Sequence, residues 1–156
     1  MMISIERQIA DMAAHLPDWT VELLDARSAV WIGSLQPYTT RYTIRIEQRI
    51  PYLVENRTLI DVQPLIEVLS PKLMLQPGNP EGDLPHVYWS LPQTERAGPF
   101  LCVFDAEARE WTLDDPLSHS IVPFTLHWLQ SYEGWLACGD WLGFGRHTGG
   151  KRTGVC

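Results

Sequence analysis

Residues 19–46, WTVELLDARSAVWIGSLQPYTTRYTIRI, decide the fold that the sequence predicts. Three short segments in this stretch alternate apolar and polar residues with a period of two, and short turns separate them. The predicted strands are residues 19–25, 29–35 and 38–46. In the third, Tyr42, Ile44 and Ile46 share one face, and arginines and a threonine occupy the other. This pattern is typical of an antiparallel meander with one solvated face.

The segments on either side of the meander extend the same fold. Residues 3–16 carry apolar side chains at spacings of three and four, which predicts an amphipathic helix that Pro17 ends. Residues 64–70 form a candidate fourth strand, closed by Pro71. We therefore expect one helix followed by four antiparallel strands.

A second helical pattern lies near the C-terminus. Residues 121–136 repeat large apolar side chains at three to four positions, with Pro123 in the first turn, where proline is tolerated. Ser118 is the expected N-cap, and Gly134 and Gly139 are expected to break the helix into two pieces. Helices segregated from an antiparallel sheet indicate an α+β fold.

The bulk composition predicts one domain over residues 1–156. The chain has 45% hydrophobic and 20% charged residues, which is ordinary for a globular domain of this length. A net charge of −7 argues against nucleic-acid binding, which needs clustered basic residues. The basic residues between positions 146 and 152 stand among glycines, so we expect a frayed terminus there.

The sequence also predicts the compartment. No stretch approaches the roughly 18 apolar residues of a membrane span, and the first 16 residues lack the pattern of a signal peptide. The chain has three cysteines, and an odd number without a signal peptide favours free thiols in a reducing compartment. We expect a cytoplasmic protein without a membrane partner.

Chemistry is most strongly indicated at Cys102. Residues 76–98 hold four prolines and three glycines, which predicts a long irregular loop of the kind that carries functional sites. Cys102 follows at its end, inside the apolar segment 100–104, and His86 and Tyr88 precede it by 16 and 14 residues. An inert core cysteine is the competing interpretation of Cys102. A structural or solvent-facing role competes in the same way for His86.

An acidic stretch between residues 105 and 115 follows Cys102 directly. Nearby carboxylates disfavour a thiolate, whereas a cysteine protease needs the thiolate stabilised. An ordinary thiol remains nucleophilic enough to exchange with a thioester, which is already activated. This chemistry requires a Cys102 sulfur that solvent and a visiting chain end can reach. The carboxylates could also help to deprotonate an incoming amine, or form a solvated surface loop.

No metal or cofactor is expected. His119, His127 and His147 lack the spacing of metal ligands, and no phosphate-binding glycine motif is present. Cys138 lies in the tryptophan-rich helical region, where a core position is expected, and Cys156 ends the chain.

Several short motifs together resemble a known family. They are His86-Val-Tyr88, Phe100-Leu-Cys102-Val-Phe104, Glu110-Trp111, Ile121-Val-Pro-Phe124, Trp128 to Trp135, and Gly139-Asp-Trp141. This set is similar to the bacterial ubiquitin-conjugating-enzyme-like proteins of antiphage operons that also encode cyclic-oligonucleotide-making nucleotidyltransferases. The resemblance implies a ubiquitin-conjugating fold with an N-terminal helix, a four-stranded antiparallel meander, a long active-site loop and C-terminal helices.

The resemblance also implies roles for single residues. Cys102 would accept the C-terminal acyl group of a protein as a thioester and pass it to a nucleophile. His86 would stand where the eukaryotic enzymes begin a His-Pro-Asn motif, and Trp111 would pack under the active-site loop. This chain has His86-Val87-Tyr88 and lacks the Asn, so Tyr88 or backbone N–H groups would serve as the oxyanion donor.

The implied partner is an acyl-donor protein with a free C-terminus, either the nucleotidyltransferase or a ubiquitin-like protein. Because the chain has no nucleotide-binding motif, a separate activating enzyme would use the ATP, or the donor would arrive activated by another route. Two alternatives stay open. One is a non-catalytic adaptor of the same fold, and the other is a hydrolase that pairs Cys102 with His119, His127 or His147.

Overall fold

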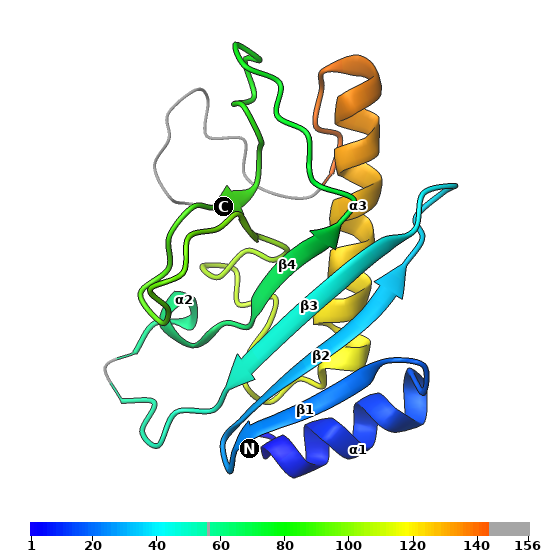
Figure 1. Ribbon diagram of the computed structural model, residues 1–156. Helices are drawn as coiled ribbons and strands as arrows, with labels where there is room; N and C mark the ends of the chain where they lie inside the picture. Colours follow the sequence, from blue (N-terminus) through cyan, green and yellow to red (C-terminus); the bar gives the residue numbers. More distant parts are fainter. Residues whose placement is uncertain (56, 144–156) are drawn as a thin grey trace.

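The structure, a computed structural model, describes residues 1–55 and 57–143. Its elements, in chain order, are α1 (Ile5–His15), β1 (Thr20–Asp25), β2 (Ser28–Leu35), β3 (Tyr42–Arg49), α2 (Leu59–Val62), β4 (Leu65–Ser70), β5 (Val87–Tyr88), β6 (Phe100–Leu101), the 3-10 turn η1 (Leu117–His119) and α3 (Ile121–Cys138). The first four strands form one antiparallel sheet in sequence order (Figure 1). This arrangement confirms the predicted α+β fold.

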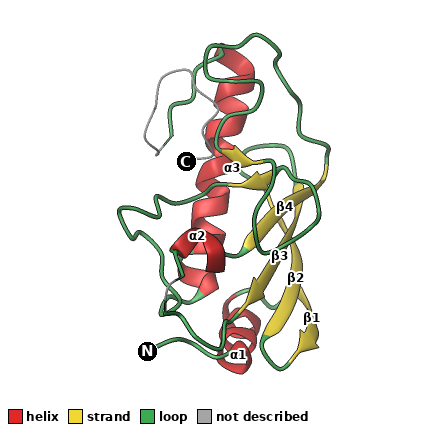
Figure 2. Cartoon of the chain, turned by 90° about the vertical axis from the view of Figure 1, so that its left-hand side faces the viewer, coloured by secondary structure: helices red, strands yellow, loops and turns green. Residues whose placement is uncertain are grey.

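The sheet and α3 form two layers (Figure 2). The predicted alternation in β3 is confirmed, since Tyr42, Ile44 and Ile46 are buried and the residues between them are partly exposed. The hydroxyl of Tyr42 donates to Glu133 of α3 over 2.8 Å, and its ring meets Tyr132 edge-on. The apolar face of the sheet therefore packs on α3 and forms the main core.

Helix α1 lies beside β1 at the edge of the sheet (Figure 1). It begins two residues after the predicted start, because the Ser4 side chain accepts a hydrogen bond from Arg7 N and caps the helix. Its fully buried Gln8 accepts from Leu117 N and donates to the Asp115 carbonyl. Gln8 thus joins the start of the chain to the turn that precedes α3.

Helix α3 corrects two sequence predictions. It runs through Gly134 without a break and ends at Gly139, whose φ of 82° gives a left-handed C-cap. The cost of a helical glycine is about 1 kcal/mol, and the burial of Trp128 and Trp135 on either side outweighs it. Ser118 does not cap α3, because it lies in η1 and its hydroxyl donates to Asp11.

Other boundaries differ as well. The third strand covers Tyr42–Arg49 rather than residues 38–46. The four-residue helix α2 was not predicted. Gly33 of β2 allows the Trp19 ring to lie across the backbone, since a Cβ there would come within 2.0 Å of the ring.

In the part of the chain that the structure describes, no helix combines the length and apolar character that crossing a bilayer requires. The basic residues predicted to form a frayed terminus, and Cys156, lie outside the described residues.

Candidate functional site

The β5–β6 hairpin brings the predicted site residues together. Strand β5 (Val87–Tyr88) pairs with β6 (Phe100–Leu101), so that Tyr88 lies opposite Phe100. Beyond this pair, the backbone N–H of Cys102 donates to the His86 carbonyl over 3.0 Å. His86 and Cys102 therefore face each other at one end of a small antiparallel ladder, and Tyr88 lies two residues further along β5, where the long loop to β6 begins.

The Cys102 sulfur lies against Tyr88. Its distance to the Tyr88 hydroxyl is 3.4 Å, and its distance to the Phe104 carbonyl is 3.7 Å. Leu65 and Phe100 belong to the same buried cluster, and Cys102 is only 4% exposed. Cys102 is disulfide-bonded in the structure, so the expectation of a free thiol is wrong for this residue. The expectation of a solvent-accessible sulfur is also wrong, because Cys102 packs in the buried cluster with Leu65 and Phe100.

The Tyr88 hydroxyl is protonated at neutral pH. Burial raises the pKa of Tyr88, and the negative charge of Asp105 raises it further, whereas the side chain of Gln63 acts in the opposite direction. With 6% exposure, Tyr88 is a buried phenol whose hydrogen is available for donation. At this position it can donate to an oxygen or sulfur that gains negative charge.

The backbone of His86 joins the hairpin to α3. Its carbonyl accepts from Cys102 N and, over 2.8 Å, from the indole N–H of Trp128 on α3. Its φ of 52° is in the left-handed region, which few residues other than glycine adopt. Its ring packs against Trp141, with 5.0 Å between the ring centroids. Trp128 therefore positions the hairpin, a role that the sequence did not predict.

The acidic stretch after Cys102 builds local turns. Asp105 Oδ1 accepts from the backbone N–H groups of Glu107 and Ala108, and Glu110 accepts from Asp105 N. Trp111 is fully buried and packs on Phe104 with 5.4 Å between ring centroids. These contacts hold the segment after Cys102 in place. Of its carboxylates, Asp105 raises the pKa of Tyr88 through its negative charge.

An ion cluster fixes the hairpin loop to the sheet. Arg96, in the loop between β5 and β6, pairs with Glu67 of β4 at 3.0 Å and with Glu47 of β3 at 3.3 Å. Arg45 pairs with the same two carboxylates at 3.1 and 2.8 Å. The guanidinium of Arg96 also lies 5.8 Å from the centroid of the Phe100 ring. We call these four charged residues the Arg96 clamp.

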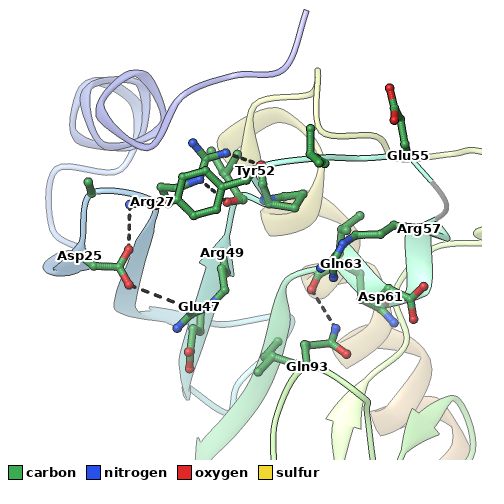
Figure 3. Close-up of a pocket in the computed structure, with 16 residues that line it drawn as sticks. Asp25, Arg27, Glu47, Arg49, Tyr52, Glu55, Arg57, Asp61, Gln63 and Gln93 are labelled. Carbon is green, nitrogen blue, oxygen red and sulfur yellow. Dashed lines mark hydrogen bonds and ion pairs between the residues drawn. The ribbon is translucent and has the colours of Figure 1, made fainter.

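A groove of about 880 Å³ lies between the ends of β3 and α2 (Figure 3). Gln63 and Leu65 line it, and Leu65 also packs in the Cys102 cluster. On the same wall, Gln93 Nε2 donates to the carbonyls of Ile60 and Gln63 over 3.1 and 3.2 Å. Leu65 therefore lines the groove and also packs in the buried cluster with Tyr88 and Cys102.

The remaining candidate residues lie elsewhere. His119 packs its ring on His15 of α1 at 4.4 Å, and His127 is exposed on α3. His147 lies outside the described residues. Cys138 is exposed at the end of α3, so its predicted core position is wrong, because the helix turns this position towards solvent. Within residues 1–55 and 57–143, no three His, Cys, Asp or Glu side chains converge as a metal site would require.

Comparison with known proteins supports this reading of the fold. None of the curated proteins searched matches the chain. A family model, E2-CBASS, described as Type II CBASS E2 protein, matches residues 8–148 and thus almost the whole chain. The observed order of helix, four-stranded antiparallel sheet and C-terminal helix agrees with an E2-like fold. The chain therefore belongs to the Type II CBASS E2 family, the bacterial E2-like proteins of CBASS antiphage operons.

Proposed function

We propose that this chain carries the C-terminal acyl group of a protein as a thioester on Cys102 and transfers it to a nucleophile on a target. The observation that carries the proposal is the 3.4 Å approach of Tyr88 to the Cys102 sulfur, on a hairpin that also gathers His86. The E2-like family supports the same reaction class. The acyl donor is the operon's nucleotidyltransferase or a ubiquitin-like protein, and either a separate enzyme uses ATP to activate it or it arrives activated by another route.

A thiol reductant first reduces the disulfide of Cys102 and leaves the free thiol, and the reaction then proceeds in two exchanges. The Cys102 sulfur attacks the carbonyl carbon of the activated donor, and the donor's leaving group departs with the proton of the thiol. An amine or another nucleophile on the target then attacks the new thioester, gives up its proton, and releases Cys102 as a thiol. Each step passes through a tetrahedral oxyanion, which the protonated Tyr88 hydroxyl can stabilise in place of the missing Asn.

A peptide thioester tests the proposal. Reduced protein is incubated with a peptide that ends in a glycyl thioester, and intact mass is recorded before and after thiol treatment. We expect a thiol-sensitive adduct on Cys102 that Cys102→Ser abolishes or converts to a thiol-resistant oxyester. Cys138→Ser is the matched control, because Cys138 is exposed and would collect any nonspecific acylation. An adduct found on Cys138 alone would contradict the proposal.

Tyr88→Phe tests the oxyanion donor. This variant keeps the ring that packs beside Cys102 and Phe100 and removes only the hydroxyl. We expect acyl transfer to the target to fall about tenfold or more, the lower range for loss of one oxyanion donor. Unchanged transfer would remove Tyr88 from the mechanism and leave the role to backbone N–H groups.

The burial of Cys102 favours a second candidate function, a non-catalytic adaptor. In this role the chain would bind a ubiquitin-like protein or the nucleotidyltransferase without forming a bond. Cys102→Ser in the intact operon separates the two functions when protection against phage is measured by plating. An adaptor keeps full protection, since Ser is close in size to Cys, whereas a thioester enzyme loses it.

A further inference from the structure

The disulfide of Cys102 blocks the residue that the proposed reaction needs. The thiolate is the nucleophile of cysteine chemistry, and a sulfur that is bonded to a second sulfur cannot attack a carbonyl. Among the described cysteines Cys138 is a free, exposed thiol, so the bond at Cys102 is specific to the candidate site. Whether this bond is closed or open therefore decides whether the site can react.

The surroundings of Cys102 determine which sulfur a reductant can attack. Cys102 is 4% exposed and packs among Leu65, Tyr88, Leu91 and Phe100. In thiol–disulfide exchange a thiolate attacks one sulfur and the other sulfur leaves, and access selects between the two. Burial shields the Cys102 sulfur from direct attack, so the attack falls on the sulfur bonded to it. Cys102 is then the sulfur that leaves.

Tyr88 stands where the leaving sulfur gains its negative charge. The distance from the Tyr88 hydroxyl to the Cys102 sulfur is 3.4 Å. Because burial raises the pKa of Tyr88, the phenol keeps its hydrogen at neutral pH and can donate it to a thiolate. A hydrogen bond to an ionised acceptor is stronger than one between neutral groups, and a better stabilised thiolate leaves faster. Asp105 opposes this effect, because its negative charge also acts on Tyr88.

We propose that the Cys102 disulfide is a redox switch, in which a thiol reductant opens the bond and the Tyr88 hydroxyl stabilises the departing Cys102 sulfur. A thiolate of a dithiol reductant attacks the sulfur bonded to Cys102, the S–S bond breaks, and Cys102 leaves with the electron pair and takes up a proton. The second thiol of the reductant resolves the mixed disulfide. The protein gains two electrons and two protons, and the reductant becomes a disulfide. Oxidised glutathione closes the bond again by the reverse exchange.

A redox titration tests the switch. Full-length protein purified without reductant is equilibrated with mixtures of reduced and oxidised glutathione at neutral pH, and free thiols are then alkylated with iodoacetamide in denaturant. Peptide masses assign the alkylated residues, and Cys138 is the internal standard because it is free at the start. We expect Cys102 to be alkylated only in the reduced mixtures, in one reversible transition. Alkylation of Cys102 without any reductant, or a bond that stays closed in fully reduced glutathione, would overturn the proposal.

Tyr88→Phe tests the role of the phenol in the switch. The variant keeps the buried ring and removes the hydroxyl, so reduction of the Cys102 disulfide by dithiothreitol should slow by about fivefold, as for the loss of one hydrogen bond. Tyr38→Phe is the matched control, because Tyr38 is an exposed tyrosine between β2 and β3. Equal rates in Tyr88→Phe and the wild type, or an equal loss in Tyr38→Phe, would overturn this role.

The switch rests on the proposed function only for its consequence in acyl transfer. Its readout is alkylation, which needs no acyl donor. Protein that is alkylated at Cys102 after reduction but forms no thioester with a peptide thioester would refute the proposed function and leave the switch in place. Protein whose Cys102 bond does not respond to glutathione, but which forms the thioester after stronger reduction, would refute the switch alone.

Discussion

The Arg96 clamp should control access to Cys102. The segment it fixes to the sheet runs between β5 and β6 and includes Leu91, which packs in the Cys102 cluster. Replacing Arg96 with Ala removes the ion pairs to Glu67 and Glu47 and frees this segment. We therefore expect Arg96→Ala to raise the fraction of molecules in which reagents reach the sulfur.

The size of the effect follows from the exposure of the clamp. The Arg96 side chain is 46% exposed, and ion pairs of this kind contribute about 0.2–1 kcal/mol each. Arg45 continues to neutralise both carboxylates, so the variant leaves no buried charge without a partner. A total loss of about 1 kcal/mol corresponds to roughly a fivefold rise in the open population.

Alkylation of Cys102 by iodoacetamide measures this population. The protein is kept reduced and carries Cys138→Ser and Cys156→Ser, so that a single thiol reacts. When opening and closing are fast, the rate follows the open population. We expect about fivefold faster alkylation in Arg96→Ala. High salt should speed the wild type towards the variant, because it screens the clamp, and should change the variant little.

Arg41→Ala is the matched control. Arg41 is an exposed arginine directly before β3, so its loss changes the net charge by the same amount without touching the clamp. Equal alkylation rates in Arg96→Ala and the wild type, or an equal rise in Arg41→Ala, would refute the reasoning. In the first case the loop opens without breaking the clamp, and in the second the effect is one of overall charge.

Three further predictions concern stability. Gln8→Leu leaves the buried N–H of Leu117 without its acceptor, so the free energy of unfolding should fall by about 2–3 kcal/mol in urea with an unchanged slope; a loss below 0.5 kcal/mol would contradict the role of this contact. Gly139→Ala forces a Cβ into the left-handed region, so the melting temperature should fall by about 2–4 °C, and an unchanged value would contradict the cap. The pKa of Asp61 is lowered because the backbone N–H and hydroxyl of Thr58 donate to its carboxylate. The stability that this cap adds is therefore present above the ordinary pKa of 3.8 and is lost as the pH falls through the lowered pKa of the folded protein. Asp61→Asn should flatten urea stability against pH in that acid range, and an unchanged pH dependence would assign it to other carboxylates.

Local patterns predicted the parts of the fold that local chemistry determines. The alternation at Tyr42, Ile44 and Ile46 placed the buried face of β3 correctly, since successive side chains of a strand point to opposite faces and the apolar ones mark the buried face. The predicted break of α3 at Gly134 is wrong, because the packing of the helix in the core outweighs the low helix propensity of glycine, which costs about 1 kcal/mol. The predicted core position of Cys138 in the same helix is wrong, because a tryptophan-rich sequence does not reveal which helix face points outward.

The site was less accessible to sequence reasoning. Strands β5 and β6 have two residues each, too few for an alternation to be recognised. The meeting of Cys102 with His86 and Tyr88 was therefore implied by the family resemblance and not by spacing. Trp128 acts through a bond that spans 42 residues. This contact leaves no periodic signal, because only tertiary packing makes the pair.

The burial of Cys102 places a requirement on the proposed reaction. Acyl transfer through this sulfur, which is 4% exposed and disulfide-bonded, takes place only in molecules where the disulfide is reduced and the cover has moved, and the observed rate scales with their fraction. The cover consists of short elements, namely two-residue strands and the four-residue helix α2, which are the kind of units that open locally. The backbone N–H of Cys102 and the indole of Trp128 both bind the His86 carbonyl, which anchors the base of the hairpin to α3. Opening from the Arg96 side would therefore expose the sulfur while leaving this anchor intact, so access and alignment can be controlled by different residues.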